Sequence, residues 1–212
     1  SGRTDRGKVR ERNEDGLLNQ PDRGVWGVAD GMGGHQDGGV ASQLIVQRIA
    51  GLFHHGRLED RAHALRQCLL EVHHRLGQGA AARGKSCVIG STVVALLIEG
   101  ERAVCIWAGD SRCYLWRGKR LYQLSRDHSL FQRLLDEEHM SPERAAQHPQ
   151  AHALTRAVGS RDLLDLDVIE LNIRQDDVFL LCSDGLYQTI AHSDIGKALN
   201  LKSPQLALNS LF

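Results

Sequence analysis

The sequence lacks a charge imbalance, and it has little proline. Its 212 residues contain 26 Lys and Arg against 26 Asp and Glu, so the formal net charge is zero. Without a global field of either sign, attraction to nucleic acid, anionic lipid or a strongly charged partner is not expected. With 4 prolines, 22 glycines and 42% hydrophobic residues, the composition excludes collagen-like, proline-rich and disordered chains. The length suits one globular domain, residues 1–212.

Long apolar runs and paired cysteines are also missing. The longest apolar runs, residues 91–98 and 103–108, are far shorter than the ~20 residues of a membrane-spanning helix. No secretory signal pattern is visible at the beginning of the sequence. The five cysteines form no Cys-x-x-Cys pair and mostly lie in apolar segments, where a free thiol behaves as a small hydrophobic group. We therefore expect a reduced, cytoplasmic protein without a membrane span or a zinc site.

Short segments rich in β-branched and aromatic residues predict a series of strands. They are residues 25–29, 91–98, 103–108, 113–116, 121–124, 163–173 and 178–182, with a hairpin turn at 117–119. Helical spacing of apolar residues predicts helices over 40–54, 61–76, 193–199 and 203–211. The polar segment 127–152 is expected to be an inserted surface subdomain, with one helix over 130–138 and another beginning after Ser141. Strands packed as sheets with helices grouped outside them indicate an α+β fold.

Carboxylates follow or end several of these strands. They occur in Asp30-Gly31, Gly109-Asp110 and Asp184-Gly185, and a further acidic pair is Glu14-Asp15. A single Asp-Gly is usually a turn, and Asp37-Gly38 is interpreted as one. Carboxylates at several strand ends can converge, and converging carboxylates repel one another unless a cation lies between them. Oxygen ligands without His or Cys favour Mg²⁺ or Mn²⁺ over zinc.

Two polar groups near these carboxylates allow more than one interpretation. Arg10 lies three residues before Asn13, and by its spacing it is either a solvated surface residue or a bidentate ligand for phosphate beside the metal ions. The hydroxyls of Ser91 and Thr92 have no base nearby in sequence. A covalent mechanism is therefore disfavoured, and this pair is expected to support strand packing.

Seven short motifs follow one another along residues 4 to about 190. They read Asp5-Arg6-Gly7-Lys8-Val9-Arg10-Glu11-Arg12-Asn13-Glu14-Asp15, Val28-Ala29-Asp30-Gly31-Met32-Gly33-Gly34-His35, Gly90-Ser91-Thr92, Gly109-Asp110-Ser111-Arg112, Ser125-Arg126-Asp127-His128-Ser129, Leu154-Thr155-Arg156-Ala157-Val158-Gly159 and Leu181-Cys182-Ser183-Asp184-Gly185-Leu186. In this order they resemble the bacterial metal-dependent protein phosphatases of the PP2C (PPM) family. The spacing is also similar to that of small bacterial enzymes that oppose serine/threonine kinases, including those associated with type VI secretion.

The resemblance implies a fold and a metal centre. The fold would be a four-layer αββα sandwich of two antiparallel sheets flanked by helices, with two Mn²⁺ or Mg²⁺ ions in a cleft at one end. Asp30 would bridge the two ions, with the Gly31 carbonyl beside it. Asp184 would ligate one ion, and Asp15 would act from the other side, directly or through water. Glu14 would orient a water on the metal.

The resemblance also implies a third ion and a way of holding the substrate. Asp110 and Asp184 would together hold a third, weaker ion. Arg10 matches the phosphate-binding arginine, and residues 127–152 match the flap beside the cleft. The implied reaction is hydrolysis of phosphoserine and phosphothreonine on proteins by a metal-activated water. The implied partners are a phosphorylated protein and a cognate serine/threonine kinase pathway, and the enzyme is expected to be a monomer that binds no nucleic acid.

Two departures from the family pattern keep other functions in view. Met32 stands where eukaryotic members carry a histidine, so their proposed leaving-group acid is missing, and His35 is the nearest substitute. Members of the family normally end with a Gly-rich Asp-Asn segment in a last strand, which supplies a further ligating Asp. This segment is not in the sequence, so we expect that strand to be missing. A catalytically impaired phosphoprotein-binding module is the alternative. A two-metal nuclease is a third option, which the neutral charge balance disfavours.

Overall fold

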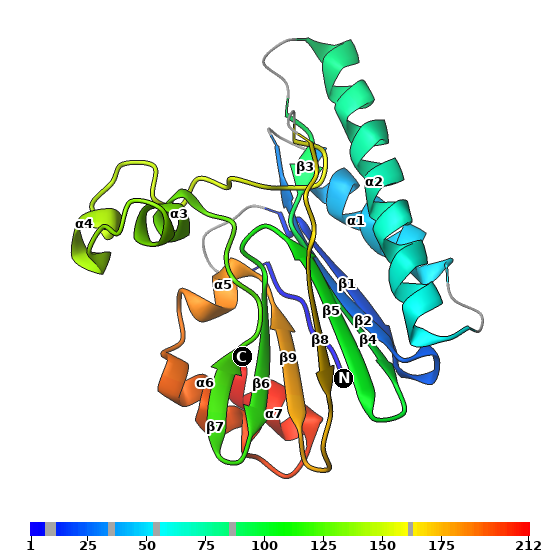
Figure 1. Cartoon of the computed structure of the whole chain (residues 1–212), viewed down its shortest axis with the longest axis vertical. Helices are drawn as coiled ribbons and strands as arrows, with labels where there is room; N and C mark the ends of the chain where they lie inside the picture. The colour runs from blue at the N-terminus through cyan, green and yellow to red at the C-terminus, as the bar shows by residue number, and fades with distance from the viewer. Residues whose placement is uncertain (7–11, 34–36, 53–55, 85–87, 161–162) are drawn as a thin grey trace.

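The computed structural model describes residues 1–6, 12–33, 37–52, 56–84, 88–160 and 163–212. Within these ranges the chain forms two antiparallel sheets with helices outside them (Figure 1). The larger sheet has the order β1-β2-β4-β5-β8, with β3 paired to β2, and the smaller sheet has the order β7-β6-β9. The strands are β1 (Asp15–Gln20), β2 (Val25–Met32), β3 (Gly90–Ser91), β4 (Val93–Glu99), β5 (Arg102–Ala108), β6 (Arg112–Arg117), β7 (Arg120–Gln123), β8 (Asp167–Asn172) and β9 (Val178–Cys182).

The helices lie at both outer faces and in one protruding segment. They are η1 (Pro21–Arg23), α1 (Asp37–Ala50), α2 (Leu58–Arg83), α3 (Leu130–Asp136), α4 (Pro142–Ala146), α5 (Asp184–Tyr187), α6 (His192–Leu199) and α7 (Pro204–Leu211). In Figure 1, α1 and α2 cover the larger sheet, while α6 and α7 lie behind the smaller one. Among the described residues, no helix combines the length and apolarity that crossing a membrane requires.

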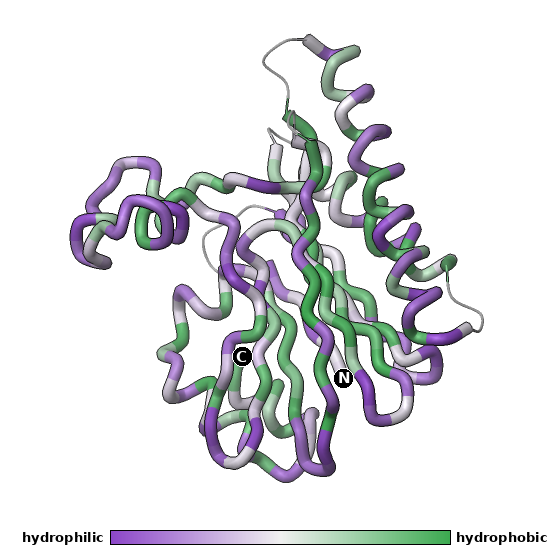
Figure 2. The backbone as a smooth tube through the Cα atoms, viewed as in Figure 1, coloured by the Kyte–Doolittle hydropathy of each residue, from purple (hydrophilic) through white to green (hydrophobic). Residues whose placement is uncertain are grey.

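The alternation of side chains along the strands produces the layers. On β4, Val93, Ala95 and Leu97 pack in one cluster with α1 and α2, whereas Val94 and Leu96 pack in a second cluster between the sheets. A third cluster joins the other face of the smaller sheet to α6 and α7. Successive residues of a strand point to opposite faces, so each sheet contributes to two apolar layers. The four-layer αββα sandwich implied by the sequence is confirmed, and Figure 2 shows hydrophobic residues along the strands of both sheets.

Most of the predicted elements are confirmed within a few residues. The strand pattern was clearest where both faces are buried, as in β4 and β5. The expected helix after Ser141 is α4: the Ser141 side chain accepts a hydrogen bond from the Arg144 amide, and Pro142 occupies the first turn. The predicted strand over 163–173 is shorter, because only Asp167–Asn172 pairs with β5. Of the cysteines, Cys68, Cys105, Cys113 and Cys182 are buried and free, and Cys87 lies outside the described residues.

Three local features differ from the sequence prediction. The interpretation of Asp37-Gly38 as a turn was wrong, because these residues begin α1. A Cβ on Gly38 would lie 2.9 Å from Gly31 C, so glycine serves close packing here and not a turn. Strand β1 was not predicted, since its polar ends hide the alternation and pairing with β2 creates the strand. Helix α5 is too short to show a periodicity.

The segment that holds α3 and α4 projects away from the sandwich (Figure 1) and is mostly hydrophilic (Figure 2). Its two ends are joined by hydrogen bonds from the Leu130 amide to the Ala153 carbonyl and from the Thr155 amide to the His128 carbonyl, each 2.8 Å long. We call residues 127–129 and 153–155 the neck. The neck is attached to the β5–β6 turn, because the His128 amide donates to the Gly109 carbonyl at 3.0 Å.

Candidate metal centre

Strands β1 and β2 place two of the predicted metal ligands opposite each other. Asp15 and Asp30 are partners in the antiparallel register at the end of the β1–β2 pair. Directly opposite residues point to the same face of a sheet, with Cβ atoms about 4.5–5.5 Å apart. Asp30 is 9% exposed, and Asp15 is half-buried. The structure therefore brings these two carboxylates together as the sequence predicts.

The backbone of Asp30 is held by the hydroxyl groups of Ser91, in β3, and of Thr92, which lies between β3 and β4. Its amide donates to Thr92 Oγ1 at 3.0 Å, and its carbonyl accepts from Ser91 Oγ at 2.9 Å and from the Thr92 amide at 2.9 Å. Thr92 Oγ1 is also 2.7 Å from Ser111 Oγ. All three hydroxyl residues are buried. The Ser91–Thr92 pair therefore orients Asp30, in agreement with a supporting role and not with a nucleophile.

Glycines let α1 approach this end of β2. A Cβ on Gly31 would lie 2.1 Å from the Gly38 carbonyl oxygen, so no other residue fits at position 31 without displacing α1. The Gly31 amide donates to the Glu14 carbonyl at 3.2 Å, and that carbonyl also accepts from Ser42 Oγ. Glu14 Oε1 lies 2.9 Å from the position of a Cβ on Gly38. Glu14 therefore lies between Gly31, in β2, and Gly38, in the first turn of α1.

The smaller sheet supplies Asp184, the third predicted ligand. Strand β9 ends at Cys182, and Ser183 Oγ then donates a 3.0 Å hydrogen bond to Asp15 Oδ2. The next residue, Asp184, begins α5 and is half-buried. A contact between residues so distant in sequence ties the end of the smaller sheet to the Asp15–Asp30 pair.

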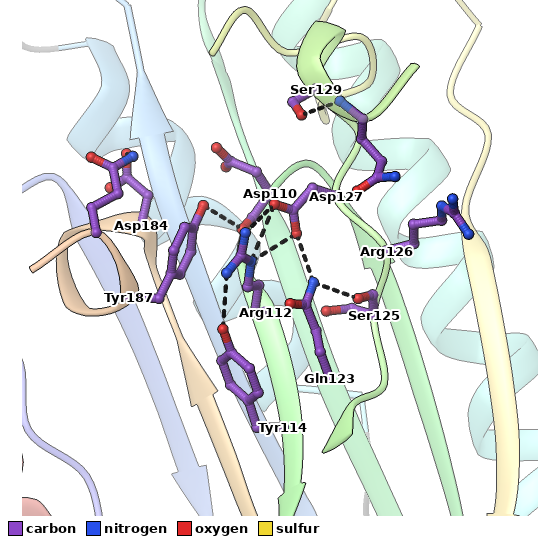
Figure 3. A network of polar contacts seen from close by, with 12 residues as sticks. Asp110, Arg112, Tyr114, Gln123, Ser125, Arg126, Asp127, Ser129, Asp184 and Tyr187 are labelled. Carbon is purple, nitrogen blue, oxygen red and sulfur yellow. Dashed lines mark hydrogen bonds and ion pairs between the residues drawn. The ribbon is translucent and has the colours of Figure 1, made fainter. Parts of the chain in front are cut away.

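Asp110, the fourth predicted ligand, lies in the turn between β5 and β6. Burial, followed by the nearby charges of Asp184 and Asp127, raises the pKa of Asp110 to about 6. Figure 3 shows Asp110 between Asp184 on one side and Asp127 on the other. The raised pKa means that the ionised carboxylate of Asp110 is unfavourable in the metal-free protein. A cation at this position would remove the penalty.

The arrangement fits a hard divalent cation. The described residues contain no group of three or more His, Cys, Asp or Glu side chains that could hold a metal ion, and the carboxylates lie instead as two pairs, Asp15 with Asp30 and Asp110 with Asp184. Mg²⁺ keeps several waters and is commonly bound through one or two carboxylates. Pairs of carboxylates with a glycine backbone beside them suit Mg²⁺ or Mn²⁺, whereas the thiolate and imidazole ligands of structural zinc are missing from them.

Two predicted residues, Arg10 and His35, lie outside the described residues. Met32 ends β2, next to Gly33. His128 is buried in the neck, where its Nδ1 accepts a hydrogen bond from the Gly109 amide at 3.1 Å. Burial lowers the pKa of His128. These contacts give it an organising role in the neck.

One family matches the motifs and the sandwich along most of the chain. The model of the family described as protein phosphatase 2C matches residues 6–206. The chain belongs to the protein phosphatase 2C family. The serine/threonine phosphatase Stp of Listeria monocytogenes is 33% identical over 207 residues, which are 94% of this chain and 82% of that protein. Other relatives, such as PhpP of Streptococcus pneumoniae and PstP of Mycobacterium tuberculosis, are also protein phosphatases. This chain is an enzyme of that bacterial type.

Two solved structures of the family extend the comparison. One is PppA, described as a key regulatory component of T6SS (type VI secretion) in Pseudomonas aeruginosa: it has a TM-score of 0.88 and 43% identity, covering 97% of this chain and 85% of that one. The other is the catalytic domain of the phosphatase PstP in complex with two manganese ions, with a TM-score of 0.81 and 31% identity over 99% of this chain and 87% of that one. Protein phosphatase 2C enzymes are metal-dependent, and the second structure shows a two-metal centre on this fold.

Three contacts at this end of the sandwich come from residues that were not predicted: Ser183 donates to Asp15, Tyr187 donates to the Asp110 carbonyl, and Arg112 stacks on Tyr187. Ser183, Arg112 and Tyr187 make no acidic or glycine-rich pattern of their own. Ser183 and Arg112 lie in two of the seven sequence motifs, close to the predicted ligands Asp184 and Asp110. Tyr187 lies three residues after Asp184, but this spacing has meaning only once α5 is known to be a helix.

Proposed function

We propose that this protein phosphatase hydrolyses phosphoserine and phosphothreonine monoesters on proteins at the end of the sandwich where Asp15 faces Asp30. The observation that carries the proposal is this register pair, with Ser183 donating to Asp15 and so bringing Asp184 alongside. The family assignment supports the reaction class, and the named relatives support the amino acids that carry the phosphate.

The ligands that we propose come from four segments. Asp30 would bridge two divalent ions with the Gly31 carbonyl beside it, and Asp15 and Asp184 would bind from opposite sides. Glu14 would contribute through water. Asp110 with Asp184 would hold a third, weaker ion. When bound, the ions supply a water activated at neutral pH and Lewis-acid stabilisation of the phosphoryl charge.

The side chains of the protein position and support these groups. Thr92 and Ser91 bond the Asp30 backbone on both sides, so its carboxylate does not have to reorganise when a substrate binds. Their hydroxyls are engaged in these bonds, which argues against a phosphorylated serine or threonine intermediate. For Arg10, the resemblance supports a bidentate contact to the substrate phosphate.

The segment with α3 and α4 is proposed to select the substrate, because it projects from the sandwich (Figure 1) and its neck is bonded to Gly109, the residue before Asp110. The cellular role that we propose is opposition to a serine/threonine kinase in the cytoplasm by a monomeric enzyme. Type VI secretion is one candidate pathway, supported by the likeness to PppA.

The test is phosphate release from a phosphothreonine peptide as a function of Mn²⁺ concentration. We expect Mn²⁺-dependent release by the wild-type chain and none by Asp30→Asn. Asp22→Asn, an exposed carboxylate at the opposite end of the same strand pair, is the matched control and should keep the wild-type rate.

Calorimetry with Mn²⁺ and with the peptide separates the two candidate functions. If the wild-type chain binds Mn²⁺ and releases no phosphate from any phosphopeptide tested, the hydrolytic proposal is wrong. Peptide binding under those conditions would favour the impaired phosphoprotein-binding module.

A further inference from the structure

Tyr187 connects the two segments that carry Asp110 and Asp184. Its hydroxyl donates a 3.0 Å hydrogen bond to the backbone carbonyl of Asp110, in the β5–β6 turn. Tyr187 lies at the end of α5, and Asp184 lies at its beginning. This bond therefore joins α5 to the β5–β6 turn across the gap between the two carboxylates. Figure 3 shows the tyrosine directly between the two aspartates.

The hydrogen bond opposes the repulsion between the two carboxylates. Like charges push α5 away from the β5–β6 turn whenever no cation lies between Asp110 and Asp184. The tyrosine hydroxyl donates to the Asp110 carbonyl, so this contact holds the two segments together.

Arg112 holds Tyr187 from the other side. Its guanidinium carbon lies 3.5 Å from the centre of the Tyr187 ring, an arrangement that stabilises both groups by a cation–π contact. The same guanidinium forms a bidentate ion pair with Asp127, with Nε–Oδ1 at 2.9 Å and Nη2–Oδ2 at 2.6 Å. It also donates to the Tyr114 hydroxyl at 2.9 Å. With Arg112 23% exposed and Asp127 11% exposed at the side chain, water competes weakly for these bonds.

Asp127 is the first residue of the neck, so the ion pair connects the site to the segment with α3 and α4. The next residue, His128, donates from its amide to the Gly109 carbonyl and accepts from the Gly109 amide at Nδ1. Two attachments therefore run from the neck to the β5–β6 turn, one direct and one through Arg112 and Tyr187.

We propose that Arg112 and Tyr187 are positioning residues that set the spacing of Asp110 and Asp184 and couple it to the neck through Asp127. This inference rests on the proposed function, in which the two aspartates hold the weaker third ion. Neither residue is among the metal ligands proposed above, and both act through the segments that carry Asp110, Asp184 and Asp127. Their effect is on the affinity of this ion and on its dependence on the neck.

Strand β6 offers a matched control for Arg112. At its other end Arg117 makes a bidentate pair with Asp177, at 2.8 and 2.6 Å, and the Arg117 side chain is also 23% exposed. This second pair lies at the opposite end of β6 from Asp110 and Asp184. Tyr122, which is 44% exposed on β7, is the corresponding control for Tyr187.

The test is calorimetric titration of the full chain with Mn²⁺ alone. Tyr187→Phe keeps the ring and loses the hydroxyl. Arg112→Lys keeps the charge and loses the bidentate contact with Asp127 and the stacking on Tyr187. We expect each to weaken the weakest Mn²⁺ binding event about threefold to tenfold, the range of one or two hydrogen bonds, and to leave the tighter events unchanged. Arg117→Lys and Tyr122→Phe should titrate like the wild type.

Two further measurements distinguish positioning from a general loss of structure. In the phosphate-release assay, the Mn²⁺ concentration for half-maximal rate should rise by the same factor in Tyr187→Phe, and saturating Mn²⁺ should restore the wild-type rate. Amide hydrogen exchange in the neck should be faster in Arg112→Lys than in Arg117→Lys.

The outcomes separate the inference from the function on which it rests. If the wild type binds Mn²⁺ and all four variants bind it with the wild-type affinities, the positioning role is overturned and the metal centre stands. Equal weakening of every Mn²⁺ event, with no rescue at saturating Mn²⁺, would also overturn it, because that result indicates a structural defect. If the wild type binds no Mn²⁺, the proposed metal centre and the inference are both wrong.

Discussion

Asp15 and Asp30 face each other across the β1–β2 pair, at the end of the sandwich that Ser183 reaches from the smaller sheet. Like charges directly opposite on neighbouring strands destabilise a sheet. A protein that places them there, and holds the Asp30 backbone with buried hydroxyls from Ser91 and Thr92, has a structure suited to a bound cation. The predictions below follow from this end of the sandwich and from the elements packed against it.

Replacing the buried carboxylate at position 30 should separate folding from metal binding. Asp30→Ala removes the charge opposite Asp15, and its backbone bonds to Thr92 and Ser91 remain. We expect the free energy of unfolding of the metal-free protein to stay within about 1 kcal/mol of the wild-type value or to increase, and Mn²⁺ binding to be lost. Urea unfolding in a chelator and calorimetry measure the two effects. Unchanged Mn²⁺ binding would contradict the assignment of Asp30 as a ligand.

A methyl group at position 31 should damage the packing of α1 on β2. The added Cβ of Gly31→Ala would lie 2.1 Å from the Gly38 carbonyl oxygen, a backbone atom that moves only with α1. We expect a loss of about 1–3 kcal/mol in the free energy of unfolding and weaker Mn²⁺ binding.

Gly77→Ala is the control for this substitution. It lies inside α2 with nothing within 4 Å of the added Cβ. It should stabilise the protein by up to about 1 kcal/mol, because alanine is the better helix former. Urea denaturation of both variants gives the comparison, and equal stabilities would show that α1 can shift freely.

Asp110 should make the metal-free protein less stable as the pH rises. Its pKa is raised to about 6 in the folded state from an ordinary value of 3.8, chiefly by burial and then by Asp184 and Asp127. Between about pH 4 and pH 6 the unfolded state loses this proton while the folded state keeps it, so this group lowers stability with increasing pH, and the loss is complete above that range.

Asp110→Asn should therefore stabilise the metal-free protein by about 1–3 kcal/mol at pH 7.5 and have little effect near pH 4. Chemical denaturation in a chelator at both pH values measures the difference. A stabilisation of the same size at both pH values would show that ionisation of Asp110 is not its cause.

His73 should have the opposite effect at low pH. The side chain is buried in α2, its Nδ1 accepts a 3.1 Å hydrogen bond from the Gly159 amide, and burial, followed by the charge of His74, lowers its pKa. As the pH falls below about 6.5, the unfolded state takes up this proton first, so its contribution to stability is complete above that pH and decreases below it.

His73→Gln keeps a side chain that can accept from Gly159. At pH 7.5 we expect it to cost about 0.5–1.5 kcal/mol in the free energy of unfolding, and this difference should shrink as the pH is lowered to 5. Because His128 titrates in both proteins, the difference between the two stability curves isolates His73. Parallel curves from pH 5 to 7.5 would contradict the lowered pKa of His73.

The strands at the centre of the sandwich were predictable because they are short continuous apolar runs, and the long helices because their apolar residues recur with a helical period. In β4 and β5 nearly every residue is buried, and α1 and α2 repeat apolar residues on one face. Strand β1 was not predictable, since its pairing with β2 and not its composition makes it a strand. The Asp37-Gly38 pair was misread, because the reason for its glycine is contact with a segment distant in sequence.

By itself, the sequence determined which residue types are available: aspartates beside glycines at the ends of apolar strands, in an order typical of one phosphatase family. Those features are local, so they can be read from neighbouring residues. Only the tertiary structure decided that Asp15 lies opposite Asp30, that Ser183 joins the two sheets, and that Tyr187 links α5 to Asp110. These relations depend on how two sheets pack, which is the summed result of many weak apolar contacts and has no signature in any single segment.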